Sequence, residues 1–333
     1  MARRTTRYLV LGCTLAACAP GGTGSSVALP GVGAAGPRPG EAIRTADPYA
    51  RGLTDADFPR VTPLADGVFA YEQLRSAGDE RFTTVSLFVV TPAGVLVADG
   101  QGSVAETRRL VETISRYTDR PITHVVVCSD HGDHTAGNAA FPAGATFFAH
   151  PTSHAVLQAG ARNPGRSADA PPIIVPGELV ADRRVIRLGG REIHLLFLGR
   201  AHTGGDLHVH LPAERILFMS EAFLHRVFPA MRSAYPSEWV GVIDSALAMD
   251  IDIFVPGHGF IDSPAILRQE LVTFRDAIGT VIEEAKRLHA AGVSVDDAVT
   301  HARFGDLENW SLRASQAAVA IRRVYLELDG RLR

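Results

Sequence analysis

Six consecutive residues constrain the fold of this chain more than any other feature. Residues 129–134 read Ser-Asp-His-Gly-Asp-His and follow directly on an apolar run, Val125-Val126-Val127-Cys128. A strand that ends in two imidazoles and two carboxylates delivers several metal ligands to one point, and zinc accepts both ligand types. We therefore expect the end of this strand to lie at a metal site. Ser129 stands where a further histidine would be expected.

Composition and charge narrow the classes of function. The 333 residues are 46% hydrophobic and 21% charged, as in an ordinary globular protein, and the formal net charge is -3. No basic patch suits a phosphate backbone, so nucleic acid is not an expected partner. The expected partner is a small-molecule substrate.

The N-terminus has the features of an export signal. Three arginines among the first seven residues precede an apolar segment, residues 8–17, that is too short to span a bilayer. The segment ends Leu-Ala-Ala-Cys18, which resembles a bacterial lipoprotein signal whose cysteine becomes the lipidated first residue. An ordinary cleaved secretory signal is the alternative. We expect an exported protein, periplasmic or held at the cell envelope by a lipid on Cys18, which would be its membrane contact.

Three regions follow from this interpretation. Residues 1–18 are the predicted lipoprotein signal peptide, and residues 19–60 are a predicted flexible tether and N-terminal arm, because Gly, Pro, Ala and Ser dominate up to about residue 40. Residues 61–333 are the predicted folded domain with C-terminal helices. Cys128 would be the one thiol left in the mature chain, so no intrachain disulfide is expected.

The folded region is expected to alternate strands with helices twice, and each half ends in a loop that carries histidine. This pattern favours two sheets packed face to face with helices outside. Ser103 with Glu106 forms a predicted capping box, and Ser237 is a second predicted helix cap. Strands are expected at residues 68–71, 84–90, 94–98, 122–128, 145–149, 185–188, 193–198, 207–211, 215–219 and 251–255, and helices at 103–117, 237–249, 263–289 and 313–328.

Four loops carry candidate ligands, and each follows an apolar strand. The first is residues 129–134, and the others hold His202, Glu221 and His258. Glycines beside the histidines let the backbone turn sharply and bring side chains together. Residues 256–259 are accordingly expected to form a turn.

With these loops in this order, the chain resembles the metallo-β-lactamase superfamily. That family's signature is a His-x-His-x-Asp-His loop, then Gly-x-x-His-Thr-x-Gly, a Gly-Asp step and a final Pro-Gly-His. The resemblance extends from about Val61 to Phe260. It implies an α/β fold, the four-layer αββα sandwich of the metallo-β-lactamase type.

The resemblance also assigns ligands to two metal sites. Ser129 replaces a histidine of the first site, and Glu221 replaces the aspartate of the Gly-Asp step. Because a serine hydroxyl is a poor ligand, the first site is left with two good ligands, whereas zinc usually takes at least three and water. We expect one tightly held zinc at the second site and a weak or empty first site, unless Asp130 substitutes for the missing histidine. The implied ligands are His131 and His202 in the first site, and Asp133, His134, Glu221 and His258 in the second.

The implied activity is zinc-dependent hydrolysis, in which a metal-bound hydroxide attacks the carbonyl of an amide, lactone, thioester or other ester. Asp133 would bind the metal and orient or deprotonate the water, and His131 and His202, where a metal does not occupy both, would hydrogen-bond the water or the oxyanion. Two alternatives stay open. One is a metal-binding accessory lipoprotein with little catalysis, which the loss of a first-site histidine suggests. The other is iron-dependent oxidation of a persulfide, because related folds can hold iron.

Overall fold

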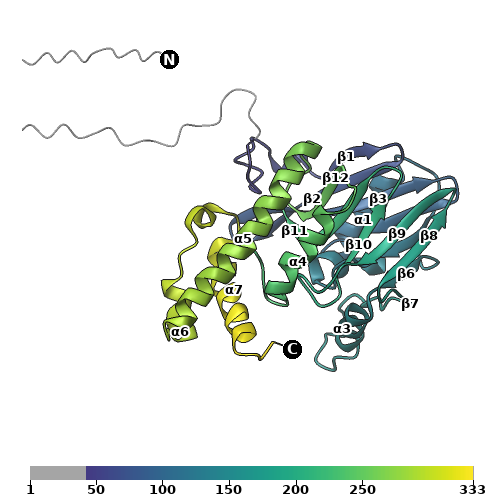
Figure 1. Cartoon of the computed structure of the whole chain (residues 1–333). Coiled ribbons are helices and arrows are strands. Elements are labelled where there is room, and N and C mark those ends of the chain that lie inside the picture. Colours follow the sequence, from purple (N-terminus) through teal and green to yellow (C-terminus); the bar gives the residue numbers. More distant parts are fainter. Residues whose placement is uncertain (1–42, 333) are drawn as a thin grey trace, which may run out of the picture. The chain divides into compact units, whose positions relative to one another are not determined.

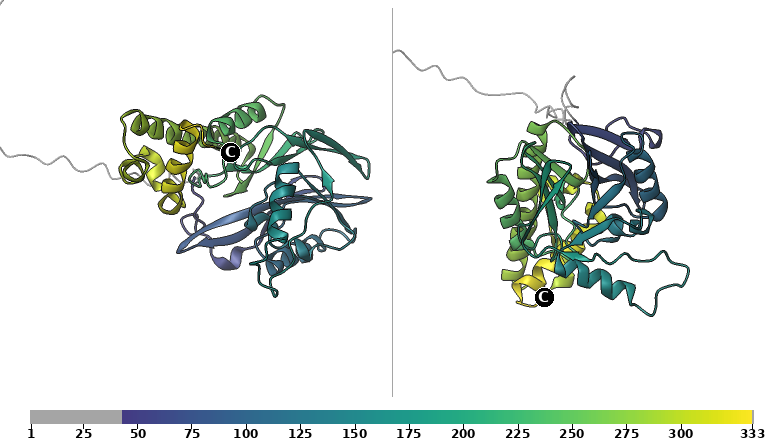
Figure 2. Two further views of the ribbon diagram at one scale, coloured as in Figure 1. Left: turned by 90° about the horizontal axis from the view of Figure 1, so that it is seen from below. Right: turned by 90° about the vertical axis from the view of Figure 1, so that its right-hand side faces the viewer.

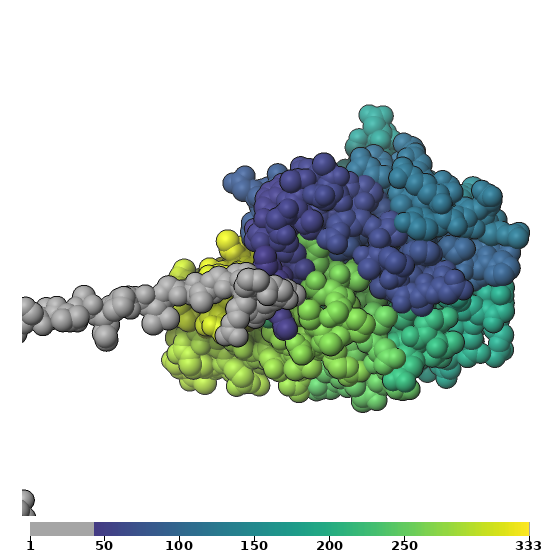
Figure 3. All heavy atoms as spheres, turned by 90° about the horizontal axis from the view of Figure 1, so that it is seen from above, coloured from purple at the N-terminus to yellow at the C-terminus, as the bar shows by residue number. Residues whose placement is uncertain are grey.

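The computed structural model describes residues 43–332, and the predicted signal peptide and the tether up to residue 42 lie outside this range. A compact unit begins at Ile43. Its first residues join the domain through ion pairs, since Arg44 lies 3.1 Å from Glu270 and Arg51 lies 2.9 Å from Asp262. Figure 3 shows this purple segment lying against the green part of the surface. No helix in residues 43–332 has the length and apolar character needed to cross a membrane.

The strands form one hydrogen-bonded sheet that curls into two facing halves (Figures 1 and 2). The predicted pair of separate sheets is therefore continuous, because β3 pairs with β12 at the single position Thr84 and His258. The predicted α/β fold of the metallo-β-lactamase type is otherwise confirmed. The first half contains β1 (Arg60–Ala65), β2 (Val68–Ala77), β3 (Glu80–Thr91), β4 (Gly94–Ala98), β5 (Ile122–Val126), β6 (Thr146–Ala149) and β7 (Glu178–Leu179), and the second contains β8 (Arg183–Leu188), β9 (Arg191–Phe197), β10 (Leu207–Leu211), β11 (Ile216–Leu224) and β12 (Ile253–His258).

Side-chain alternation along the strands builds three apolar layers from the two halves. Leu87 of β3 and Val209 of β10 belong to the cluster between the facing halves. The alternate side chains point outward. Phe88, next to Leu87, packs with the cluster under α1, and Leu217 of β11 packs with the helices on the other side. This gives the order helix, sheet, sheet, helix. The helices are α1 (Val104–Ile114), α2 (Gly132–Thr135), α3 (Pro151–Ala161), α4 (Pro236–Leu247), α5 (Pro264–Ala290), α6 (Val295–His301) and α7 (Arg313–Leu328).

Two helix starts test the capping predictions. The Ser103 hydroxyl accepts a hydrogen bond from the Glu106 amide at 3.2 Å, which confirms the cap of α1. The prediction for Ser237 is wrong, because α4 begins one residue earlier at Pro236 and Tyr235 is its N-cap. Proline suits the first helical turn, where its missing N–H leaves no hydrogen bond unmade. The Ser237 hydroxyl instead donates to Glu327 at 2.8 Å.

Two strands near the ligand loops are longer than the sequence pattern indicates. β11 continues through Ser220 to Leu224, and β12 continues to His258, so the predicted turn at 256–259 begins only at Gly259. The two strands run parallel and side by side up to the pair Leu224 and His258. Gly257 permits this approach, since a Cβ there would lie 2.4 Å from the backbone of Ser220.

Glu72 on β2 gives the fold a pH dependence of its own. The side chain is buried, and its carboxylate accepts a hydrogen bond from the Ile261 amide at 3.1 Å. Burial raises the pKa of Glu72 to about 7, against the partial opposition of Arg60 at 3.8 Å. The folded state therefore holds a proton that the unfolded chain releases near pH 4.5. The resulting stability is fully present below about pH 4.5 and is lost as the pH rises through about 7.

We expect Glu72→Gln to remove this pH dependence. Glutamine keeps an acceptor for the Ile261 amide and carries no charge, so the variant should be more stable than the wild type at pH 8. The difference in the free energy of unfolding should be on the order of 2 kcal/mol. Urea unfolding at pH 5 and pH 8 measures it. Equal pH dependence in the two proteins would contradict the assignment.

Candidate metal site

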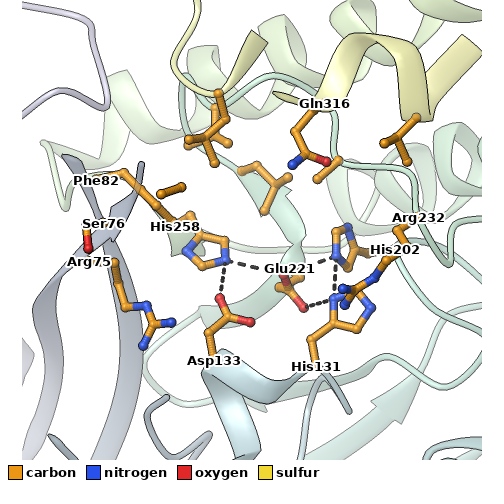
Figure 4. A pocket seen from close by; sticks show the side chains of 16 residues that line it. Arg75, Ser76, Phe82, His131, Asp133, His202, Glu221, Arg232, His258 and Gln316 are labelled. Atoms are coloured by element: carbon orange, nitrogen blue, oxygen red, sulfur yellow. Dashed lines mark hydrogen bonds and ion pairs between the residues drawn. The ribbon is translucent and has the colours of Figure 1, made fainter. Parts of the chain in front are cut away.

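The six predicted ligands meet at the edge of the sandwich where β11 and β12 lie beside the loop after β5, and Figure 4 shows all of them except His134. Their ligand atoms form two groups, and within each group the atoms lie within 4.8 Å of one another. Glu221 belongs to both groups. Asp130, the possible substitute ligand, belongs to neither. The four-residue group, which corresponds to the second site of the family, is Asp133, His134, Glu221 and His258. The three-residue group, which corresponds to the first site, is His131, His202 and Glu221.

The four-residue group has spacings suited to zinc. The Nε2 atom of His258 lies 3.2 Å from Asp133 Oδ2 and 3.3 Å from Glu221 Oε1. It also lies 3.4 Å from the Nε2 atom of His134. Ligand atoms around a tetrahedral zinc, each at about 2.1 Å from the ion, are separated by about 3.4 Å. The donor set and its spacing therefore fit a zinc ion.

The three-residue group places two imidazoles against the same carboxylate. His131 Nδ1 lies 3.0 Å from Glu221 Oε2, and His202 Nε2 lies 3.1 Å from Glu221 Oε1. The two imidazole nitrogens are 3.0 Å apart. One oxygen of Glu221 thus faces His131, while the other faces both His202 and His258. Glu221 would supply this group with a third ligand in place of the histidine that Ser129 replaces.

Ser129 supports Glu221 directly. Its side chain is fully buried, and its hydroxyl donates a hydrogen bond to Glu221 Oε2. Glutamate is one methylene longer than aspartate, and its carboxylate lies against the side chain of residue 129. The two departures from the family pattern are therefore in direct contact.

Backbone geometry turns Glu221 toward the other ligands. Ser220 has φ 48°, a conformation uncommon for residues other than glycine, and the pairing of β11 with β12 shifts register on both sides of it. This irregularity interrupts the strict alternation of side chains. The Ser220 hydroxyl hydrogen-bonds the buried carboxylate of Asp99, which holds the irregular position in place.

Outer partners fix the orientation of the histidines. Asp99 Oδ2 lies 3.1 Å from Nδ1 of His134, and the backbone carbonyl of Thr83 lies 2.8 Å from Nδ1 of His258. Both imidazoles consequently present Nε2 to the ligand group. Asp99 Oδ1 also accepts a hydrogen bond from the Cys128 amide at 2.8 Å, at the end of the strand that leads into the ligand loop. The sequence interpretation missed Asp99, although an acidic residue directly after the apolar run of β4 was an available signal.

The side chains of the site strongly influence one another's ionisation. Burial on its own lowers the pKa of His258, but the hydrogen bonds and charges of Asp133 and Glu221 outweigh it and raise that pKa to about 10. Burial likewise lowers the pKa of His131, and Glu221 outweighs it to give a pKa of about 9. Burial favours a raised pKa for Glu221, yet His202, His131 and His134 hold it well below its usual range. The carboxylates are thus ionised and complementary to cations.

A pocket of about 320 Å³ opens over the ligand groups (Figure 4). It exposes one face of the cluster to a small molecule, while the outer partners lie behind. Its lining includes His131, Asp133, His202, Glu221, His258, Arg75, Ser76, Ala77, Phe82, Leu224, Val227, Ala230, Arg232, Leu312, Gln316 and Val319.

Asp99→Asn is expected to lower zinc affinity about ten-fold. The amide keeps the shape of the side chain, but it lacks the negative charge that orients His134 and increases the basicity of the imidazole. Isothermal titration with zinc on chelator-treated protein measures the effect, and Asp119→Asn on the exposed surface is a matched control. Unchanged zinc affinity in Asp99→Asn would refute this role.

Comparison with known proteins agrees with the fold. A sequence model of the metallo-beta-lactamase superfamily matches residues 79–258. The 2,4-dinitroanisole O-demethylase subunit alpha of Nocardioides sp. (strain JS1661) is 28% identical over 207 residues, which are 60% of this chain and 55% of that protein. The chain thus spans about half the length of this relative. A metallo-beta-lactamase type 2 of Bacillus sp. (strain 170) is 22% identical over 216 residues, which are 63% of this chain and 80% of that protein.

Solved structures show the same fold at low sequence identity. The metallo-beta-lactamase from Pontibacter korlensis has a TM-score of 0.57 and 18% identity, and the alignment covers 65% of this chain and 98% of that one. The stereoselective inverting sec-alkylsulfatase Pisa1 from Pseudomonas sp. has a TM-score of 0.60 and 14% identity, with 80% of this chain and 50% of that one covered.

Proposed function

Because this chain belongs to the metallo-β-lactamase superfamily, we propose that it is a zinc-dependent hydrolase that cleaves a small-molecule amide, lactone, thioester or other ester. The observation that carries the proposal is the pair of ligand groups that share Glu221 beneath an open pocket. The predicted lipid on Cys18 would hold this hydrolase at the cell envelope.

The ligand groups differ in their expected affinity for metal. Asp133, His134, Glu221 and His258 would hold one zinc tightly, since four protein ligands converge there. His131, His202 and Glu221 would hold a second metal more weakly, with three protein ligands and one of them shared. Zinc bound in this cluster supplies Lewis acidity and lowers the pKa of water toward neutrality.

The chain's own residues would supply the remaining chemistry. Asp133 faces the pocket with a side chain that is 24% exposed, so its carboxylate can hydrogen-bond and orient an attacking water. His131 also lines the pocket, and the Ser233 hydroxyl lies 3.2 Å from its Nε2 atom. When protonated, this imidazole would donate to an oxyanion that develops on the substrate. Because these groups are already arranged before the substrate binds, less free energy would be needed to reach the transition state.

Metal analysis and a substrate panel test this proposal together. Chelator-treated protein is reconstituted with zinc or iron, its metal content is measured, and hydrolysis of esters, lactones, thioesters, β-lactams and an aryl methyl ether is assayed. The ether is included because one relative is named as an O-demethylase subunit. We expect hydrolysis of at least one class by the zinc form and loss of that activity on chelation. A fully zinc-loaded protein that hydrolyses none of them would refute the proposal, and oxygen uptake with a persulfide by the iron form would replace it.

A further inference from the structure

Two arginines line the pocket at opposite ends of the ligand cluster. Figure 4 shows Arg75 on the side of Asp133 and Arg232 on the side of His131 and His202. Arg75 lies on β2, and Arg232 lies in the segment between β11 and α4. The two guanidinium groups therefore enter the pocket from distant parts of the chain.

Arg75 is held in place and partly neutralised. Its Nη1 atom donates to Glu106 Oε2 at 3.1 Å, and its side chain is 22% exposed. The guanidinium packs over Gly102, where a Cβ would lie 1.7 Å from Nη1. Its Nε atom is buried without a hydrogen-bond partner among the described residues. Arg75 thus lines the pocket as a guanidinium held in place by Glu106, which offsets its charge.

Arg232 contributes a charge that no close ion pair offsets, although the Asp130 carboxyl lies near enough for the two charges to interact. The residue is exposed at the pocket, and no carboxylate in residues 43–332 forms an ion pair with it. Its charge nevertheless reaches the site, because it opposes the effect of Glu221 on the pKa of His131. An unpaired guanidinium with several free donors is a ready partner for an anionic group.

The overall charge of the pocket favours an anion once metal is bound. The carboxylates of Asp133 and Glu221 carry two negative charges, and a single zinc ion balances both. Glu106 balances Arg75, and Arg232 adds a positive charge at the pocket that the nearby Asp130 carboxyl offsets only in part, since no close ion pair joins them. Any second metal would increase that charge further.

Much of the remaining lining of the pocket is apolar. Phe82, Leu224 and Val227 contribute to it, as do Leu312 and Val319, with Gln316 as a polar residue between the last two. Leu312 and Val319 belong to the C-terminal region, beyond the segment that matches the superfamily model. A wall of this kind buries hydrocarbon and adds affinity in proportion to the apolar area removed from water.

We propose that the substrate of this site is an amphiphilic anion, whose negatively charged group is held by Arg232 and whose apolar chain packs on the wall that Leu312 and Val319 complete. The proposal rests on the proposed function and specifies its substrate class. Arg75 strengthens the same preference to a smaller degree, because its charge is already paired with Glu106.

Binding of matched probes tests the inference without turnover. Hexanesulfonate and hexyl methyl sulfone share their chain, and only the first is charged. Calorimetric titration of the zinc-loaded full chain should show the sulfonate binding about ten-fold more tightly than the sulfone at low ionic strength, and this preference should shrink as salt screens the charge. Arg232→Gln should remove most of the preference, and Arg75→Gln should reduce it about three-fold.

Two controls separate charge from packing. Arg184→Gln, on β8 and outside the pocket, should leave both affinities unchanged. Val319→Ser should weaken both probes by a similar factor, because it alters the apolar wall and not the charge. Zinc content and melting temperature are measured for every variant, so that loss of fold or metal is recognised.

The outcomes distinguish this inference from the proposed function. Equal affinity of the wild type for both probes, or an unchanged preference in Arg232→Gln, would overturn the inference even if the zinc protein is an active hydrolase. Strong, Arg232-dependent preference for the sulfonate would support the inference even if every hydrolysis assay in the panel fails.

Discussion

Glu221→Ala should reduce the zinc affinity of the four-residue group by at least about a hundred-fold. It should also abolish binding of a second, weaker zinc equivalent at the group of His131 and His202. The substitution leaves Asp133, His134 and His258 in one group and only His131 and His202 in the other. Loss of a partner that merely orients a ligand costs about 10- to 100-fold in metal affinity, so loss of a ligand itself should lie at or above the top of that range. Hydrolytic activity should fall with the metal.

Glu221→Asp separates the two roles of this carboxylate. In the wild type, the Glu221 oxygens lie 3.0 Å from His131 and 3.1 Å from His202. Shortening the side chain by one methylene withdraws the oxygens from both histidines. Aspartate at this position is the family pattern for the second site, so the tight zinc should be retained within a few-fold. We expect the aspartate variant to lose the weaker equivalent and the alanine variant to lose both the weaker equivalent and most of the tight affinity.

Zinc titration monitored by calorimetry, with metal content measured after dialysis, reports both stoichiometry and affinity. Glu214→Ala provides a control, since Glu214 is an acidic residue outside both ligand groups. If Glu221→Ala and Glu221→Asp bind zinc like the wild type, the carboxylate is not a ligand and the shared arrangement is wrong.

The sequence was sufficient to predict which residues meet at the site, because the ligands stand directly after apolar strands in a fixed order. His134, His202 and His258 could each be assigned from their loops. The contribution of Glu221 to both groups could not be predicted in this way. It depends on the irregular backbone at Ser220, where φ is 48°, and on a hydrogen bond from Ser129, a residue 92 positions away.

The fold shows the same division between local pattern and tertiary context. Hydrophobic alternation located most of the strands, and the Ser103 cap located α1. The continuation of β2 through Glu72 was missed because that residue is polar, and its burial depends on tertiary contacts that include the Ile261 amide, Thr62 and Arg60. β12 was likewise predicted to end at the Pro256-Gly257 step, because its close packing on β11 is not visible in the local sequence.

Ser129→His should disable the site, although it restores the residue that the superfamily has at this position. Ser129 is fully buried and its hydroxyl contacts Glu221, so an imidazole would have to occupy the space of that carboxylate. Displacement of Glu221 disturbs both ligand groups. We expect zinc affinity and activity to fall about a hundred-fold, whereas Ser129→Ala, which loses only the hydrogen bond to a charged group, should lose about ten-fold.

The double variant Ser129→His with Glu221→Asp should recover what the single substitutions lose. The shorter carboxylate vacates the space that the imidazole needs, and the imidazole becomes the third ligand beside His131 and His202. Contacting residues show coupling free energies of about 0.5–3 kcal/mol in double-mutant cycles. The effects of these two substitutions on the free energy of zinc binding should couple near the upper end of that range. Two zinc equivalents in the double variant, with one in Glu221→Asp, would establish that Glu221 stands in for the missing histidine. Additive losses would show instead that Ser129 and Glu221 act independently, and the chain would then rely on one metal.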